Sequence, residues 1–359
     1  MASQAKPIFL KGDPILVRNA RLQSRGKKLW PEILCFVAVL LVGNLIQGMA
    51  LAAPQMIAMF SSDAFHQMEQ YLQQSMEAGT FQMDTYLRLA TEAASTSMPQ
   101  WFTVLTLFST FLPAAVVILY CRKLEKRSFS TMGLTRRTAL PEYLIGLGVG
   151  LLLFVIVLGL NFLTGSIRFS GVVFRASALP LLLLTFLGYL IQGASEEILC
   201  RGYFCVSVSR WMPLWVGVLV NSIAFSLMHL LNSGITPLAL LNLFLFGVFM
   251  SLYMIRCGNL WGACAIHSMW NFAQGNLFGL QVSGIPSKNS VFAITQTADH
   301  ALWNGGSFGP EGGLCVTAVL AVSILLLLLC RNRDRGQKAL PVPEKPVSYT
   351  HLRAHETEA

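Results

Sequence analysis

Long apolar runs are the feature that most restricts how this chain can fold. A helix of about 20 apolar residues is long enough to cross a hydrocarbon core of about 30 Å. Runs of this kind lie at 30–52, 101–121, 143–163, 179–209, 212–231, 238–255, 259–276 and 313–330. Only 12% of the 359 residues are charged, whereas soluble domains carry about 25%. The sequence therefore predicts an all-α polytopic membrane protein with about eight transmembrane helices, embedded in a lipid bilayer.

The distribution of positive charge predicts the orientation of these helices. The net charge is +9, but Lys and Arg lie in short segments beside apolar runs, so we expect no nucleic-acid partner. If both termini are cytoplasmic, all but four of the 26 Lys and Arg fall on the cytoplasmic side. Those four are Arg88, Arg168, Arg175 and Lys288. This asymmetry fits the positive-inside rule, and we expect a multi-pass protein of the cell membrane, of the prokaryotic plasma-membrane kind.

Three regions follow from this pattern. Residues 1–29 form a basic cytoplasmic segment, and residues 30–335 form the membrane domain, with a functional core at about 179–276. Residues 336–359 are polar and contain prolines, so we expect a disordered tail. Its last part, 347–359, looks like translated adapter sequence rather than natural protein, and we exclude its histidines from the search for a site. The loops at 53–100 and 277–312 show no chemistry, although the first has spacing that permits an amphipathic helix.

Ionisable residues inside membrane helices are energetically costly and often mark function. Three apolar runs carry ionisable or strongly polar residues: Glu196, Glu197 and Arg201 in the run at 179–209, His229 in the run at 212–231, and His267 with Asn271 in the run at 259–276. Asn242 adds one further polar side chain between them. A single buried histidine is more often a hydrogen-bonding partner between helices, but the accumulation of these residues favours a catalytic site.

The two adjacent carboxylates should have different roles. Glu197 and Arg201 are four residues apart and share a helix face, so they can form an ion pair. Glu196 points about 100° away from Glu197 and is left free. A carboxylate in this position can act as a general base towards water. The alternative is that the three residues form only an ion pair that packs helices together.

The histidines can complete such a site if the helices bring them together. His267 and Asn271 share a helix face, and both can donate hydrogen bonds to a developing oxyanion. Glu196 and His229 lie about 21 and 27 Å from the turn near Arg210 that joins their helices, so they can face each other. His267 is only about 13 Å from the start of its helix. Its alignment requires a tilted helix, a broken helix or a turn sunk into the membrane.

Other sites are less well supported. Glu and His are legitimate zinc ligands, but the chain has no His-Glu-x-x-His pair, so we expect no cofactor, with zinc as the alternative. The eight cysteines include no Cys-x-x-Cys pair, and we interpret them as small apolar packing residues. Gly146 and Gly150 are spaced for close helix packing. The Gly-x-Ser-x-Gly elbow of serine hydrolases is absent.

The three motifs resemble those of the CAAX protease and bacteriocin-processing family, also called the CPBP or Abi family of intramembrane endopeptidases. Its pattern is Glu-Glu-x-x-x-Arg, Phe-x-x-x-His and His-x-x-x-Asn, and this chain has it in order from Glu196 to Asn271. The resemblance covers about 180–275 and implies a role for each residue. Glu196 and His229 would activate water, His267 and Asn271 would form the oxyanion site, and Glu197 and Arg201 would orient Glu196.

We therefore predict a membrane-embedded peptidase of the glutamic type that acts on a peptide or protein substrate. Two other hypotheses remain open. One is a non-catalytic membrane scaffold or bacteriocin self-immunity protein that binds a peptide or a partner. The other is a transporter, because intramembrane carboxylates can relay protons, although the chain shows no inverted repeat.

Overall fold

The computed structural model describes residues 14–22, 29–95, 99–287 and 289–330, and the polar tail that we expected to be disordered lies outside these ranges. The α-helices are α1 (Ile15–Leu22), α2 (Leu29–Phe60), α3 (Asp63–Glu77), α4 (Met83–Ser95), α5 (Gln100–Ser109), α6 (Phe111–Leu119), α7 (Ala139–Leu163), α8 (Leu179–Glu197), α9 (Val206–Trp211), α10 (Leu214–Leu227), α11 (Pro237–Cys257), α12 (Trp261–Phe272), α13 (Ala301–Asn304) and α14 (Leu314–Leu329). The strands are β1 (Ile167–Val172) and β2 (Phe292–Gln296).

Each apolar run of the sequence is helical, and the predicted all-α class is confirmed. Within the described residues, five helical segments are long and apolar enough to cross a membrane: 29–60, 100–124, 139–163, 176–211 and 237–257. Helices α10 and α14 are shorter apolar helices. The chain is a multi-pass membrane protein.

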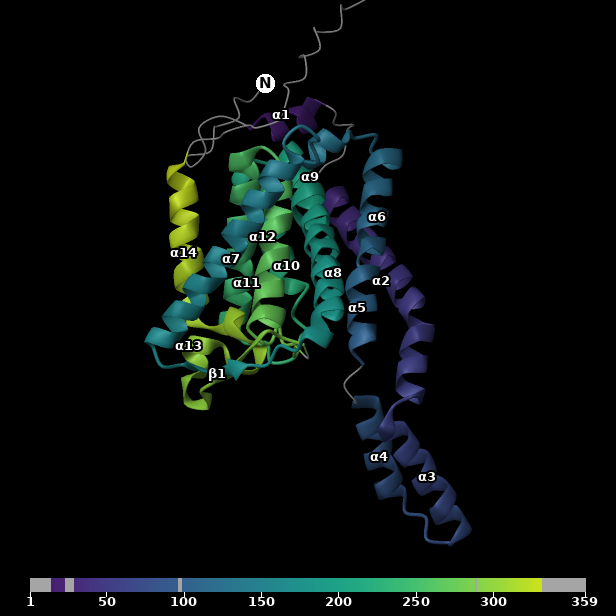
Figure 1. The fold of residues 1–359 in the computed structure, drawn as a ribbon. Helices are drawn as coiled ribbons and strands as arrows, with labels where there is room; N and C mark the ends of the chain where they lie inside the picture. The colour runs from purple at the N-terminus through teal and green to yellow at the C-terminus, as the bar shows by residue number, and fades with distance from the viewer. Residues whose placement is uncertain (1–13, 23–28, 96–98, 288, 331–359) are drawn as a thin grey trace, which may run out of the picture.

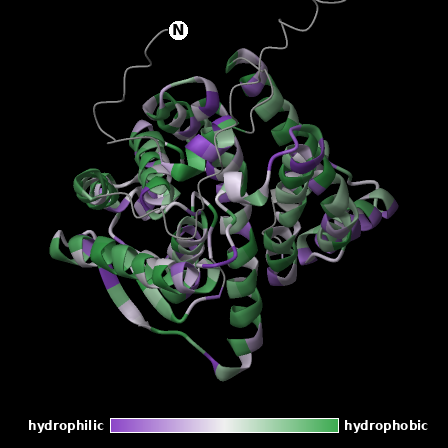
Figure 2. Ribbon diagram, turned by 90° about the horizontal axis from the view of Figure 1, so that it is seen from above, coloured by the Kyte–Doolittle hydropathy of each residue, from purple (hydrophilic) through white to green (hydrophobic). Residues whose placement is uncertain are grey.

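The outer surface of the bundle is apolar, as lipid requires. Large hydrophobic side chains are exposed along α2, α7, α8 and α14, among them Leu45, Leu152, Leu183 and Leu325. Figure 2 shows hydrophobic residues along the helices of the bundle, with hydrophilic ones gathered in short stretches. A water-soluble protein of this size would not leave so many large aliphatic side chains exposed.

The bundle has two distinct ends (Figure 1). We call the end with α1 and α9 the α9 end, and the end with β1 and β2 the sheet end. Strands β1 and β2 form a two-stranded antiparallel sheet that pairs Ile167 with Gln296, an element that the sequence analysis did not predict. Helices α3 and α4 project from the bundle beyond the sheet end (Figure 1). The loop expected at 53–100 is therefore mostly helical.

Small residues allow α12 to lie close to its neighbours. A Cβ atom on Gly146 or Gly150 of α7 would lie 2.5 Å from the Gly262 carbonyl oxygen or 2.6 Å from that of Ile266. On the α8 side, a Cβ atom on Gly193 would lie 2.5 Å from Ser268 Oγ. The predicted packing role of Gly146 and Gly150 is confirmed, and these contacts fix the position of α12.

A sunken turn explains how His267 reaches the depth of the other polar residues. The turn between α11 and α12 is buried, and Asn259 and Leu260 are both 0% exposed. Leu260 donates its backbone N–H to the Gly133 carbonyl oxygen at 2.9 Å, so the connection between α6 and α7 covers the turn. The helix of His267 therefore begins inside the protein, which is one of the three solutions expected from the sequence.

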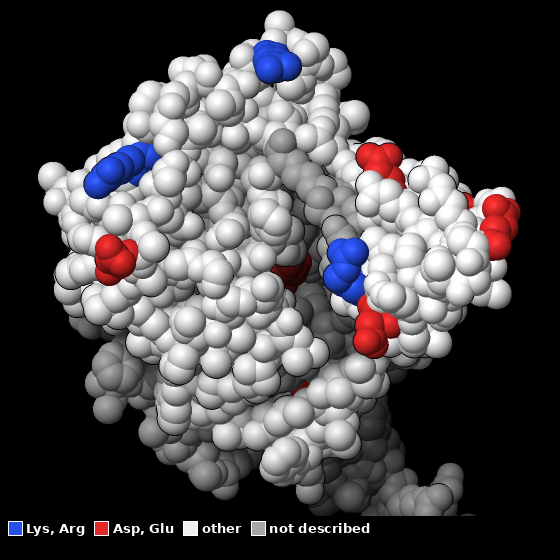
Figure 3. Space-filling model, turned by 90° about the horizontal axis from the view of Figure 1, so that it is seen from below, with Lys and Arg blue, Asp and Glu red and all other residues white. Residues whose placement is uncertain are grey.

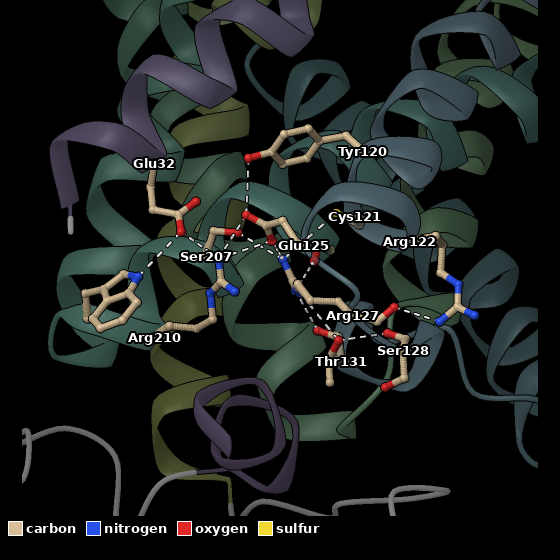
Figure 4. Close-up of polar contacts among 12 residues, drawn as sticks. Glu32, Tyr120, Cys121, Arg122, Glu125, Arg127, Ser128, Thr131, Ser207 and Arg210 are labelled. Carbon is tan, nitrogen blue, oxygen red and sulfur yellow. Dashed lines mark hydrogen bonds and ion pairs between the residues drawn. The ribbon is translucent and has the colours of Figure 1, made fainter. Parts of the chain in front are cut away.

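Buried ion pairs hold the α9 end together (Figure 4). Arg210 of α9 contacts Glu32 of α2 at 2.6 Å and Glu125 at 3.1 Å. Arg127 contacts Glu125 at 3.4 Å and donates to Ser207 Oγ at 2.9 Å. All four charged side chains are buried. Arg127 and Arg210, which the charge count placed on the cytoplasmic side, thus bind other segments within the protein. Each contacts a carboxylate that offsets the cost of its burial.

Candidate active site

A charged cluster joins α8 to α12. Glu197 is 0% exposed, and its Oε1 accepts hydrogen bonds from Arg201 Nη1 at 2.9 Å and from His267 Nδ1 at 2.8 Å. The predicted ion pair between Glu197 and Arg201 is therefore present. Arg201 lies in a π-helical segment, η4 (Ile198–Cys205), which directly follows α8, and segments of this kind often occur at functional sites. Because Glu197 accepts from Nδ1, the Nε2 atom of His267 is left to face the site.

The first carboxylate has a separate set of contacts. Glu196 Oε2 lies 3.7 Å from His267 Nε2. Glu196 Oε1 accepts from Gln192 Nε2, and Gln192 Oε1 accepts from Asn271 Nδ2 at 3.0 Å. Gln192 therefore links the carboxylate to the carboxamide. Among the described residues, the polar contacts of the Glu196 side chain are with Gln192 and His267, and the expected role of Glu197 and Arg201 in orienting Glu196 stays a prediction.

Gln192 is the residue that the motif search missed. It precedes Glu196 by four residues, so both lie on the same face of α8. The sequence does contain an indication of this contact, because the Gln192 amide lies one helical turn before the free carboxylate of Glu196. Gln192 lies outside the Glu-Glu-x-x-x-Arg pattern and was therefore not among the predicted site residues.

His229 enters the site from the end of α10. Its Nδ1 lies 2.9 Å from the Phe225 carbonyl oxygen. A carbonyl oxygen only accepts, so Nδ1 carries the proton in this contact and Nε2 of the neutral ring is an acceptor. The ring of Phe225 lies 4.9 Å from that of His229, 6.1 Å from that of His267 and 4.4 Å from the Arg201 guanidinium carbon. The Phe225 ring is therefore a common neighbour of the Arg201 guanidinium and of both imidazoles.

These side chains share a single cavity. It has a volume of about 490 Å³ and is lined by Glu196, His229, His267 and Asn271. Glu197 and Arg201 are not lining residues. The other walls are largely apolar and come from α5, α10, α11, α12 and α14, including Phe102, Phe246 and Trp270. The structure thus brings four of the six predicted residues together at the cavity. The other two lie outside its lining, where Glu197 bonds to His267 and Arg201 bonds to Glu197.

The cavity lies toward the sheet end. Residues of the loops at that end, Val282, Ser283, Ile285 and Glu311, contribute to its wall. Figure 3 shows this face from below, hollowed, with acidic atoms in the depth of the hollow. Glu311, in the segment 277–312 where we expected no chemistry, is a second carboxylate in the wall of this cavity.

The residues offer general acid and base groups together with hydrogen-bond donors. Glu196 Oε2 is buried and accepts no hydrogen bond from the described residues, so it is a carboxylate oxygen without a protein donor in a residue that lines the cavity. Within the described part of the chain, no group of three His, Cys, Asp or Glu side chains is arranged to hold a metal ion. A cavity of about 300–1,000 Å³ is typical of a ligand site.

Comparison with known proteins is consistent with this geometry. No curated protein and no solved structure matches the chain significantly. Residues 178–273, about a quarter of the chain, match one family model, and they contain all six predicted site residues. The resemblance found from the motifs is confirmed, because the matching model is that of the Rce1-like type II CAAX prenyl endopeptidases.

Proposed function

We propose that this protein is an intramembrane endopeptidase of the glutamic type. The observation that carries the proposal is the shared cavity, which Glu196 lines together with the two imidazoles of His229 and His267 and the Asn271 carboxamide. Among the described residues, no donor bonds to Oε2 of Glu196. The family match supports the same class of reaction. The surrounding helices and apolar walls exclude bulk water, which strengthens electrostatic interactions at the reacting groups.

In the proposed reaction, Glu196 takes a proton from water while His229 Nε2 orients the same water as an acceptor. The resulting hydroxide adds to the carbonyl carbon of the substrate peptide bond. The tetrahedral intermediate then collapses, the C–N bond breaks, and Glu196 returns its proton to the leaving nitrogen. The products are a carboxylic acid and an amine, which then exchange a proton to become a carboxylate and an ammonium group. General acid and base catalysis of this kind contributes about 10²–10⁴-fold.

The oxyanion of the intermediate requires donors on the other side of the carbonyl. Asn271 has two N–H donors and gives one to Gln192, so the second is available. His267 gives Nδ1–H to Glu197, and its Nε2 donates when the ring is an imidazolium, a form that the adjacent Glu197 carboxylate stabilises. Arg201 balances the charge of Glu197 in turn. Loss of one oxyanion donor typically lowers kcat by about 10²–10³-fold.

The test is hydrolysis of tagged peptides by the purified full-length protein in lipid nanodiscs. Glu196→Gln and His229→Asn should each abolish turnover while peptide binding and thermal stability remain measurable. Thr185→Val is the matched control, because the Thr185 hydroxyl bonds only to the Leu181 carbonyl of its own helix. Full activity in both site variants would sink the mechanism.

The Glu196→Gln variant also separates the peptidase from a non-catalytic scaffold or immunity protein, when hydrolysis is combined with complementation of a deletion strain. A binding protein would hold the peptide without cleaving it, and Glu196→Gln would support full biological complementation of a deletion strain. A transporter would instead move substrate across proteoliposomes. The proposed peptidase requires that complementation fail in Glu196→Gln and that cleavage products appear with the wild-type protein.

A further inference from the structure

Glu311 is a buried carboxylate of the cavity that the proposed reaction does not use. It lies between β2 and α14, is 9% exposed, and lines the same cavity as Glu196 and His229. Its Oε2 accepts hydrogen bonds from both the backbone N–H and the hydroxyl of Ser283, each at 2.7 Å. The carboxylate is therefore held in one orientation at the sheet end of the cavity.

The loop around Glu311 is held in place by hydrogen bonds from other parts of the chain. Asn242 of α11 donates to the Glu311 carbonyl oxygen at 2.7 Å and to that of Gly313 at 2.9 Å. The side-chain amide oxygen of Asn242 accepts a hydrogen bond from the Thr317 hydroxyl at 2.6 Å. Gly309 has φ +96° and its Cβ position lies 2.2 Å from a backbone oxygen, so only glycine fits there. Asn242, an unexplained intramembrane polar residue in the sequence, thus anchors the loop that presents Glu311.

The second oxygen of Glu311 is available to a ligand. Among the described residues none donates a hydrogen bond to Oε1, and this atom is not sealed from the cavity. The cavity has a second carboxylate in Glu196, but no Lys or Arg is among its described lining residues. The histidines are its only potential cations. A ligand that fills this apolar space displaces water from Glu311. Because an unpaired buried charge is unfavourable, a bound ligand should bring a group that pairs with the carboxylate.

We propose that Glu311 is a specificity residue of the cavity, where Oε1 binds a cationic group of the peptide substrate. The cation is an ammonium or guanidinium, from a Lys or Arg side chain or from a free N-terminus. This assignment rests on the peptidase function proposed above and adds the substrate class. Such a group offsets the Glu311 charge, and no Lys or Arg among the described lining residues repels it.

The test uses one apolar peptide in which a single position, scanned along the sequence, is Lys, norleucine or Glu. Each peptide is made with an acetylated and with a free N-terminus, to separate the two sources of the cation. The wild-type protein should cleave the best Lys peptide about 10-fold or more efficiently than its norleucine match, as expected for a hydrogen bond to a charged group. Glu311→Gln should reduce this ratio to about one, and Glu311→Lys should reverse it in favour of Glu.

The control is Asp299→Asn, which removes an exposed carboxylate at the sheet end that does not line the cavity. It should retain the wild-type ratio. An unchanged ratio in Glu311→Gln would overturn the proposal and leave Glu311 as a support for the Ser283 turn. If Glu311→Gln fails to accumulate, the wild-type protein alone tests the proposal. Its cleavage efficiency should be highest for the Lys peptide, intermediate for the norleucine peptide and lowest for the Glu peptide, and any other ranking contradicts the proposal.

A binding measurement distinguishes failure of this proposal from failure of the peptidase function. The Glu196→Gln variant is titrated with the same peptides, and the rise in Tm is recorded. A protein that cleaves nothing but still prefers Lys peptides through Glu311 refutes the peptidase and retains the recognition site. A protein that cleaves peptides without a Glu311-dependent preference refutes the recognition site alone.

Discussion

Glu197 of α8 and His267 of α12 share a hydrogen bond of 2.8 Å, although 70 positions separate them in the chain. The two adjacent glutamates therefore have different surroundings. The Glu197 carboxylate holds the His267 imidazole, whereas the Glu196 side chain, turned about 100° away, lines the cavity.

Gln192 should prove to be a positioning residue for Glu196. Gln192→Leu keeps much of the volume but removes both hydrogen bonds, and kcat should fall on the order of 10²-fold because the base is no longer held in place. Gln192→Glu places a second carboxylate beside Glu196, disfavours its ionised form, and should move the acidic limb of the kcat/KM profile to higher pH. Kinetics that match the wild type at every pH would remove Gln192 from the site.

Arg201→Ala should destabilise the whole protein. The change leaves Glu197 buried without a cation, which costs about 3–5 kcal/mol for a buried pair. Poor membrane accumulation and a lower Tm are therefore expected, beyond any slower turnover. The double variant Arg201→Leu with Glu197→Gln removes both charges and should recover much of the stability but not the activity. Wild-type stability of Arg201→Ala would contradict the importance of the pair.

Gly150 and Gly148 offer a matched test of helix packing. Both lie on α7, but a Cβ atom on Gly150 would lie 2.6 Å from the Ile266 carbonyl oxygen, whereas one on Gly148 meets nothing within 4 Å. Gly150→Ala should destabilise by about 1–3 kcal/mol and lower activity, because α12 carries His267 and Asn271. Gly148→Ala should leave both unchanged. Equal effects on Tm would show that α7 does not fix α12.

The sequence predicted the helical segments well because lipid imposes a length and a composition on each. It also predicted the pairing of Glu197 with Arg201, since that contact is local to one helix. The depth of His267 in the bundle was left open. It depends on the turn between α11 and α12, which is buried because residues 129–137 pack over it. The π-helical turns after Glu197 and after Phe272 were equally out of reach, since they depend on packing rather than on residue type.

The residues missed in the site share a physical reason. Gln192 and Glu311 contact partners from other parts of the chain, and neither belongs to a repeated motif. Glu311 lies in a loop rich in glycine and serine, which suggested no structure. Its position follows from Asn242, two helices earlier, which binds the loop through its carbonyl groups. No local pattern contains that information.

Chelation should leave the proposed activity intact. The proposed reaction draws both the base and the oxyanion donors from side chains, and Nδ1 of His267 is already committed to Glu197. Incubation with EDTA, followed by metal analysis of the purified protein, measures this directly. Activity that disappears with chelation and returns with stoichiometric zinc would replace the water-activating carboxylate with a metal centre, for which Glu and His are suitable ligands.

Glu311 should also make stability depend on pH in a defined direction. Burial raises the pKa of this carboxyl above its usual 4.5, and the hydrogen bonds from Ser283 offset part of that rise. The folded protein therefore keeps the proton to a higher pH than the unfolded chain does. Its contribution to stability is complete below about pH 4.5 and is lost as pH rises through the raised value.

Glu311→Gln, which carries no titrating proton, should remove this dependence. The Tm of the variant relative to wild type should therefore increase as the pH rises above about 4.5 and through the raised pKa, where the wild-type carboxyl ionises against burial. Asp299→Asn is the control, because that carboxylate is exposed, and its Tm difference should stay constant. A Tm difference for Glu311→Gln that is flat, or that falls with rising pH, would mean that Glu311 is ionised and well solvated throughout. In that case the Glu311 carboxylate needs no cationic ligand to compensate for its burial.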